Sequence, residues 1–114
     1  VVTHQTEPVA LLINHSKPAG DWLELQLVGR SCSRDAIGAT IHLQSGNQQW
    51  TAGQISGNGF LCSNERVIRV GMGSASGDCD VVVSWPDGQQ QRFHQLSLNS
   101  RWLLVQGDAD AFRW

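Results

Sequence analysis

The sequence predicts an all-β domain, an antiparallel β-sandwich or partly closed barrel of about seven or eight short strands. Several segments alternate apolar and polar residues, which is the spacing of a strand with one buried face. No stretch of about 11 to 18 residues keeps the 3.6-residue apolar spacing of a helix. Twelve glycines are spread along the 114 residues as turn signals. A chain of this length is close to the commonest domain size, so we expect one domain over residues 1–114, with 1–8 and 107–114 as flexible or linker segments.

The first half of the chain is predicted to hold four strands. The continuous apolar run at residues 9–13 is expected to be a short buried strand. Residues 22–28 alternate leucines with polar residues, and residues 39–44 repeat this pattern. The tight reversal "SGN" at 45–47 should join that strand to residues 48–55 in a hairpin.

The second half is predicted to hold a loop, four strands and a clear hairpin turn. The "PDG" turn has proline to fix φ, aspartate to cap the turn and glycine for the left-handed position. We therefore expect the β-branched run before it and the segment after it to pair. In chain order these elements are the glycine-rich loop 57–61 and the strands 66–73, 80–85, 89–96 and 101–106.

Composition and charge favour a soluble, neutral module. The formal net charge is -2, and eight basic residues against ten acidic ones leave no cluster for a phosphate backbone. Nucleic acid is therefore not expected as a partner. The longest apolar runs are far shorter than the roughly 20 residues of a membrane-spanning helix, so no membrane span is expected.

The three cysteines, Cys32, Cys62 and Cys79, do not predict a metal site. They lack the C-x-x-C spacing of a zinc centre. Either two of them form a disulfide, or all three are small apolar side chains in the interior, and the second interpretation is favoured.

Four blocks of sequence resemble one known family. They are "LVGRSCSRDAIGATI", "SGNGFL", "VGMG" and "VVVSWPDGQQQRF", and they occur in the order and approximate spacing of the ASPIC and UnbV domain. The resemblance covers about residues 11–105. Ser33, Cys62, Ser63, Val70 and Met72 depart from the family's usual residues while roughly keeping size and polarity.

The resemblance implies a cellular context. Such domains usually lie at the C-terminal end of exported proteins, behind FG-GAP or VCBS-type repeats that look like propeller blades. Cartilage acidic protein is the animal example, and the family has no established enzymatic activity. We accordingly expect a secreted, periplasmic or cell-surface location, with the propeller-like repeats of the parent chain as one partner.

The charged corner at residues 30–43 holds the first candidate site residues, Arg34 and Asp35. As a structural corner, Asp35 would accept backbone N–H groups, and Gly38 and Ala39 would be small because another strand crosses closely. As a ligand site, the pair would bind a metal or an anion. The structural interpretation is favoured, because calcium needs about six to eight oxygen ligands and one carboxylate is too few. Neither a metal nor a cofactor is expected.

Asp78 and Asp80 have D-x-D spacing, but they begin a predicted strand. An ion site at this pair is therefore not favoured. His42 and His94 are expected to face outward on strands, and no catalytic residues are predicted.

Tryptophan and glutamine provide the remaining candidate binding residues. If Trp50 or Trp102 lay on an outer sheet face among the glutamines, an aromatic plate beside amide groups would suit a sugar ring. The alternative, that both fill gaps between the sheets, is favoured; Trp22 and Trp85 are expected to pack at the core edge, with their indole N–H groups bonded to backbone carbonyls. Asn58, in the glycine-rich loop, completes the candidate set.

Three functional hypotheses follow from these observations. The leading one is a non-catalytic interaction or adhesion module that binds a protein or matrix partner, or docks on its own propeller, because no titratable groups are expected to converge. The second is a carbohydrate-binding accessory domain with a glycan partner. The third is a subunit that assists an enzyme, which would need Arg34 and Asp35 in one pocket with His42 or His94.

Overall fold

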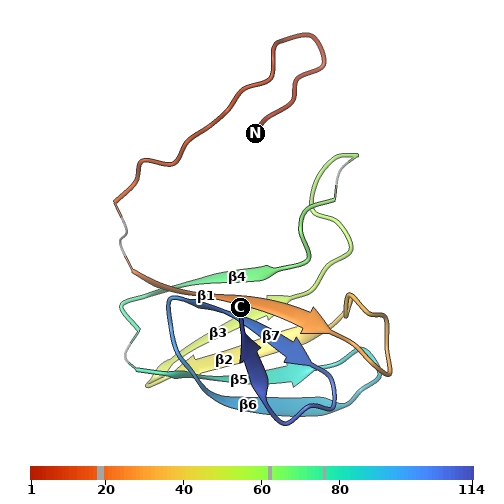
Figure 1. Ribbon diagram of the computed structural model, residues 1–114, viewed down its shortest axis with the longest axis vertical. Helices are drawn as coiled ribbons and strands as arrows, with labels where there is room; N and C mark the ends of the chain where they lie inside the picture. Colours follow the sequence, from red (N-terminus) through yellow and green to blue (C-terminus); the bar gives the residue numbers. More distant parts are fainter. Residues whose placement is uncertain (18–19, 62, 76) are drawn as a thin grey trace.

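Two four-stranded sheets pack face to face in the computed structural model, which describes residues 1–17, 20–61, 63–75 and 77–114 (Figure 1). This arrangement confirms the predicted β-sandwich. The described residues form no helix, so they include none that is long and apolar enough to cross a membrane. The first sheet has the order β4-β1-β7-β8 and the second β3-β2-β5-β6. The strands are β1 Asp21–Val28, β2 Thr40–Ser45, β3 Gln48–Gly53, β4 Ile68–Gly73, β5 Cys79–Ser84, β6 Gln90–Leu96, β7 Ser100–Val105 and β8 Ala111–Arg113.

The pairing of β1 with β7 is parallel, whereas the other neighbouring strands are antiparallel. The predicted antiparallel sandwich therefore contains one parallel pair. Parallel neighbours need a long crossover between them. The whole second sheet lies between β1 and β7 in the sequence and supplies that crossover.

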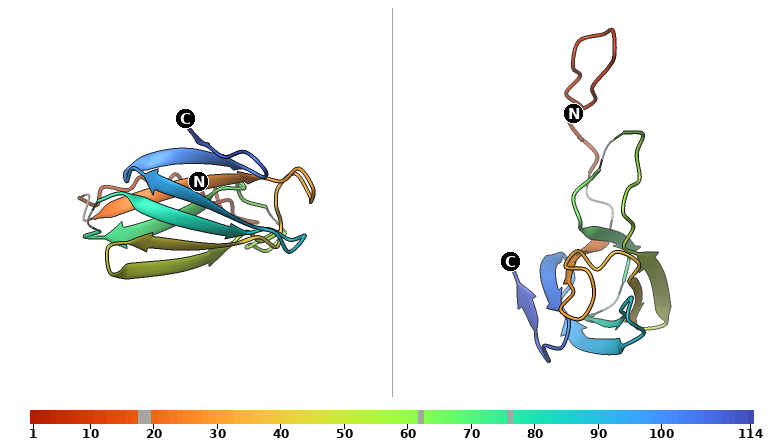
Figure 2. Two further views of the ribbon diagram at one scale, coloured as in Figure 1. Left: turned by 90° about the horizontal axis from the view of Figure 1, so that it is seen from below. Right: turned by 90° about the vertical axis from the view of Figure 1, so that its right-hand side faces the viewer.

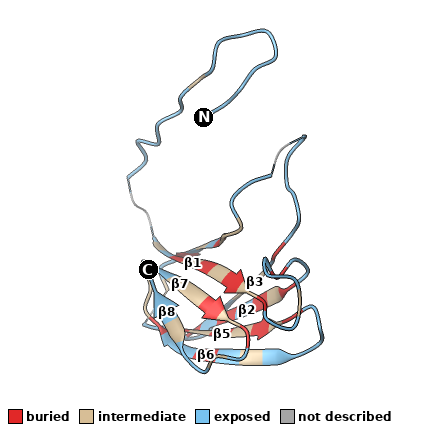
Figure 3. Ribbon diagram, turned by 45° about the vertical axis from the view of Figure 1, so that its right-hand side comes forward, coloured by how far each residue is buried: buried red, intermediate tan, exposed pale blue. Residues whose placement is uncertain are grey.

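The alternating residues predicted to face inward form the core between the sheets. Leu23, Leu25 and Leu27 of β1 are buried, and they face residues of the same phase in the second sheet, such as Ile41 and Val81. Burying one such side chain contributes about 1.5–3 kcal/mol. Figure 3 shows that burial is concentrated on the strands, while the N-terminal segment and the connection from β3 to β4 are mostly exposed.

Both predicted hairpins are present. The β2–β3 pair is joined by the two residues between Ser45 and Gln48. In the turn between β5 and β6, the N–H of Trp85 donates to the carbonyl of Gln89 at 2.8 Å. The carboxylate of Asp87 accepts the N–H of Gln89 at 3.0 Å, so the aspartate caps the turn as predicted.

The prediction of a buried strand at residues 9–13 is wrong. Val9, Leu11, Leu12 and Ile13 have exposed fractions of 66% to 72%. Ala10 of this segment forms an isolated antiparallel bridge with Val2. The segment projects away from the sandwich, on the same side as the β3–β4 connection (Figures 1 and 2). An apolar run becomes a strand only where a sheet offers it a neighbour, and none of the described strands pairs with residues 9–13.

The C-terminal residues 107–114, predicted as a flexible tail, contain strand β8. Its residues Phe112 and Ala111 pair with Leu103 and Leu104 of β7. The N–H of Trp114 also donates to the carbonyl of Arg101 at 3.2 Å. The end of the chain is therefore an edge strand of the first sheet.

Candidate interaction site

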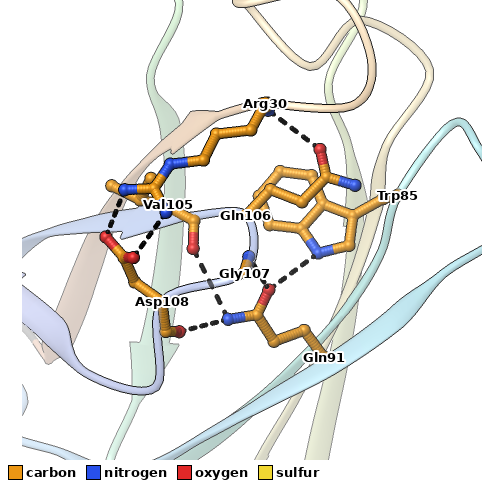
Figure 4. Close-up of polar contacts among 7 residues, drawn as sticks. All are labelled: Arg30, Trp85, Gln91, Val105, Gln106, Gly107 and Asp108. Carbon is orange, nitrogen blue, oxygen red and sulfur yellow. Dashed lines mark hydrogen bonds and ion pairs between the residues drawn. The ribbon is translucent and has the colours of Figure 1, made fainter.

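The charged corner includes most of the connection from β1 to β2, residues 29–39, and this connection is held by a buried glutamine that directly follows β7. Gln106 is 2% exposed, and its Oε1 accepts the backbone N–H group of Arg30 at 2.9 Å (Figure 4). The same oxygen accepts the N–H group of Ser31, also at 2.9 Å. The Nε2 of Gln106 donates to the carboxylate of Asp87 at 2.7 Å. Both terminal nitrogens of the Arg30 guanidinium donate hydrogen bonds to the carboxylate of Asp108, at 2.6 and 2.9 Å. Such a bidentate charged pair fixes the direction of the corner.

A second glutamine, Gln91 of β6, extends this network to the core. Its Oε1 accepts the indole N–H of Trp85 at 3.2 Å and the N–H of Gly107 at 3.0 Å (Figure 4). Its Nε2 donates to the carbonyls of Val105 and Asp108. Trp85 is buried as predicted, but its indole partner is this side-chain amide and not a backbone carbonyl. The two amides together connect the corner, the β5–β6 hairpin and the β7–β8 turn, so this network serves the architecture.

The corner residues predicted as candidates lie at its solvent side. Arg34 is exposed, and its backbone carbonyl accepts the N–H of Gly29 at 3.0 Å. The Asp35 carboxylate pairs with the Nε of Arg66, at 3.9 Å, and not with the backbone N–H groups that the structural interpretation expected. Gly38 has φ +95°, so its backbone conformation and not a crossing strand accounts for the glycine.

Arg66 organises the connection between β3 and β4, residues 54–67, which we term the 54–67 loop. Its guanidinium donates to the carbonyl of Ile55 and to the hydroxyl of Ser63, both at 3.1 Å. The Ser63 hydroxyl in turn donates to the carbonyl of Ser56 at 3.3 Å. With the ion pair to Asp35, one arginine thus ties both ends of the loop to each other and to the corner.

A shallow polar cavity of about 240 Å³ lies at the base of this loop. The candidate Asn58 lines it, and its side-chain amide contacts that of Asn64. Arg66 and Gln54 form other parts of the wall. Of the five predicted candidates, Asp35 thus pairs with Arg66, and Asn58 lines the same cavity as Arg66, a residue that no sequence pattern marked.

The tip of the 54–67 loop presents two large apolar side chains to solvent. Phe60 is 91% exposed and Leu61 is 90% exposed. Leu61 also has φ +53°, a left-handed conformation that is unfavourable for a bulky residue. The glycine-rich stretch predicts the loop, but the exposure of these side chains was not predicted. The signal for it is an apolar pair inside a glycine-rich stretch that has no strand pattern to bury it.

Trp50 and Trp102 both lie in the inward phase of their strands. Trp50 pairs with Leu43 and Trp102 with Leu25, and both indoles pack half-buried against the core. Trp102 donates its indole N–H to the carbonyl of Ser97 at 3.1 Å. Trp50 contributes to the wall of a shallow cavity between the edge of β3 and β4, and its side chain packs against the core between the sheets. The gap-filling alternative is therefore the one that the structure supports. Trp22, in contrast to its predicted core-edge position, is an exposed side chain.

The titratable groups outside the loop fall into separate contacts. His42 contacts the hydroxyl of Thr51 at 3.0 Å, and His94 contacts the carboxylate of Asp80 at 3.1 Å. The N–H of Gln95 and the neighbouring His94 hold the pKa of Asp80 below its usual range. No group of three or more His, Cys, Asp or Glu side chains with the spacing of a metal site occurs among the described residues.

The cysteines behave as the favoured interpretation expected, where the structure describes them. Cys32 and Cys79 are free thiols, half-buried and buried respectively, whereas Cys62 lies outside the described residues. Burial raises the pKa of the Cys79 thiol to about 11. Burial and the Asp87 carboxylate also raise the pKa of Cys32. Both thiols are therefore protonated at neutral pH.

The fold and the loop define a small all-β module with exposed apolar side chains and a polar cavity on its β3–β4 connection. A scan against known protein families matches the family described as ASPIC and UnbV over residues 29–111. The chain belongs to this family. No curated protein and no solved structure matches it.

Proposed function

We propose that this domain is a non-catalytic interaction module that docks on a protein surface through the 54–67 loop. The observation that carries the proposal is the pair Phe60 and Leu61, which are 91% and 90% exposed on a loop whose base is tethered. Exposed apolar clusters of this kind mark interaction sites, since solvent exposure of such side chains is unfavourable until a partner covers them.

A second apolar segment supports docking on the same side. The large apolar side chains of residues 9–13 are exposed. This segment projects from the sandwich on the same side as the loop, as Figures 1 and 2 show. A partner that covers both segments would remove several large apolar side chains from water at once. Apolar burial at this scale contributes about 25 cal/mol per Å² before the costs of association are subtracted.

The partner is proposed from the family. The resemblance to the ASPIC and UnbV family implies a module that follows FG-GAP or VCBS-type repeats in an exported protein. We therefore infer a secreted, periplasmic or cell-surface protein in which this domain binds either the propeller-like repeats of its parent chain or a protein of the surrounding matrix. Both sources would offer a folded apolar surface to the loop.

The arrangement of titratable groups favours binding over catalysis. An enzyme-assisting site would need Arg34 and Asp35 together with His42 or His94. Instead, Asp35 pairs with Arg66, whereas His42 and His94 contact Thr51 and Asp80. General acid–base work requires such groups within hydrogen-bond reach of one reacting atom.

The experiment is isothermal titration of the 114-residue chain with the repeat region of its parent chain and, separately, with purified matrix proteins of the source. The variant Phe60→Ser/Leu61→Ser should weaken binding to one of these partners by about tenfold or more. Phe112→Ser is the matched control, because Phe112 is an exposed aromatic residue on β8. Equal affinity of the loop variant and wild type for every partner that binds, or binding to neither class of partner, would overturn the proposal.

A further inference from the structure

Trp22 stands on the outer face of the first sheet, at the start of β1. Its Cα partner on β4 is Gly71, and its indole is 38% exposed. The backbone is fixed on the other side, since Asn99 accepts the N–H of Trp22 at 3.3 Å and donates its own N–H to the Trp22 carbonyl at 2.7 Å. The backbone that carries this partly exposed side chain is therefore held in place, far along β1 from the corner that adjoins the 54–67 loop.

Gly71 has no requirement within the described fold. Its φ is outside the left-handed region, and a β-carbon at this position would meet no atom within 4 Å. Glycine in a strand interior is unfavourable, and it commonly marks a place where a ligand or another backbone comes close. Gly71 therefore leaves an open floor on the sheet.

The tryptophan does not cover this glycine. An aromatic ring laid across a strand glycine is a known stabilising arrangement. In that case the ring atoms would lie in contact with a β-carbon placed on Gly71, and here that space is empty. The indole therefore lies beside the open space above Gly71 and not across it.

Trp22 and Gly71 belong to a cavity of about 160 Å³, which Glu24 and Arg69 also line. A cavity of roughly 150 Å³ is large enough for one six-membered ring. Glu24 is 14% exposed and pairs with Arg69 at 2.9 Å and with Arg101 at 2.7 Å, while Arg69 also contacts Glu65 at 2.5 Å. The charged residues of the rim, Glu24 and Arg69, thus belong to a balanced network of two carboxylates and two guanidinium groups.

We propose that this cavity is a carbohydrate subsite that binds one pyranose ring. The apolar C–H face of the sugar would lie against the Trp22 indole, over the floor that Gly71 leaves open. Ring hydroxyls would then hydrogen-bond to the remaining lone pairs of Glu24 and the remaining N–H groups of Arg69. An ionic ligand is disfavoured because the rim charges already neutralise one another, and a purely apolar group would leave the rim without hydrogen bonds.

The test is a titration of the 114-residue chain with oligosaccharides of glucose, mannose, xylose and N-acetylglucosamine, followed by tryptophan fluorescence and NMR. We expect at least one of them to bind. Trp22→Ala should weaken that binding by about tenfold or more, because it removes the platform. Gly71→Val should do the same by filling the floor, while folding is retained, since valine favours strands and the position has room. Trp114→Ala, which removes another exposed tryptophan, should bind as wild type does.

Three outcomes would overturn the proposal. The first is that none of these sugars binds the wild-type chain. The second is that Gly71→Val binds the sugar as well as wild type while it unfolds at the same temperature. The third is that Trp22→Ala abolishes binding of a protein partner with no sugar bound, which would assign the cavity to protein recognition. None of these results depends on Phe60 and Leu61, so the subsite and the docking loop are tested separately.

Discussion

At the scale of single residues, buried amides hold the loops of this sandwich in place. Gln106 satisfies two backbone N–H groups of the corner and the carboxylate of Asp87 at the same time. Within the described part of the chain, no fully buried side-chain nitrogen or oxygen lacks a hydrogen-bond partner. A donor that loses its partner while still buried costs about 1–3 kcal/mol, so such amides are sensitive positions.

We expect Gln106→Ala to lower the free energy of unfolding by about 2–4 kcal/mol, because the N–H groups of Arg30 and Ser31 lose their shared acceptor. Urea unfolding followed by circular dichroism measures this change. Gln90→Ala is the matched control, since Gln90 is exposed on β6 and should change stability by less than about 0.5 kcal/mol. Equal effects of the two substitutions would contradict the structural role of Gln106.

The buried thiol of Cys79 gives a prediction about pH. Burial raises its pKa to about 11 from an unfolded value of about 9. Because the folded pKa is the higher one, this group's contribution to stability is fully present below about pH 9 and is lost as the pH rises toward 11. Urea unfolding over that range should show a steeper loss of stability for wild type than for Cys79→Ala. Parallel curves for the two proteins would contradict the raised pKa.

At the scale of elements, Arg66 determines how well the 54–67 loop is held. We expect Arg66→Ala to speed hydrogen exchange at the described amides of this loop several-fold, because the guanidinium contacts to Ile55, Ser63 and Asp35 are lost. Exchange in β1 and β5 should stay as in wild type, since their bonds lie within the sheets. Arg34→Ala removes an exposed arginine from the adjoining corner and serves as the control. If the loop exchanged at the wild-type rate in Arg66→Ala, the tether would have to be abandoned.

Local pattern predicts those elements whose partners follow from alternation. The segment Asp21–Val28 and the hairpin strands are predictable because one face of each is buried, and a period of two marks that face. Strand β8 has three residues, too few to establish a period. Residues 9–13 show the opposite limit: hydrophobicity indicates a preference for burial, but it carries no information on whether a sheet edge is free.

The same limit applies to the candidate site. Asp35 was predictable from the charged corner and Asn58 from the glycine-rich loop, because turn-forming polar residues are visible locally. It missed Arg66, since the value of that arginine comes from loop atoms that the chain path brings to it. Trp22 was misplaced for a related reason: its position on an exposed face beside Gly71 depends on the register of β1 against β4.

At the scale of the whole molecule, the parallel pair β1–β7 joins strands from opposite ends of the sequence in the first sheet. The four strands of the second sheet lie between them in the sequence. Leu25 lies opposite Trp102, and Leu27 lies opposite Leu104, so strands from the two ends of the sequence share one core layer. Contacts this distant in sequence leave no local signal. They also imply that the sandwich depends on its C-terminal strands far more than on the exposed residues before β1.

This difference between the two ends can be measured by truncation. Deletion of residues 1–17 should leave the free energy of unfolding and its urea dependence close to wild type, because the segment is already exposed and its recorded pairing is internal. The urea slope scales with the surface that unfolding newly exposes, so an exposed segment adds little to it. Deletion of residues 111–114 should lower stability by about 1–3 kcal/mol, because β7 loses its β8 neighbour and Leu103 and Leu104 lose cover. A shallower urea slope after removal of residues 1–17 would show that this segment packs on the sandwich, and the docking surface proposed for it would then already be occupied.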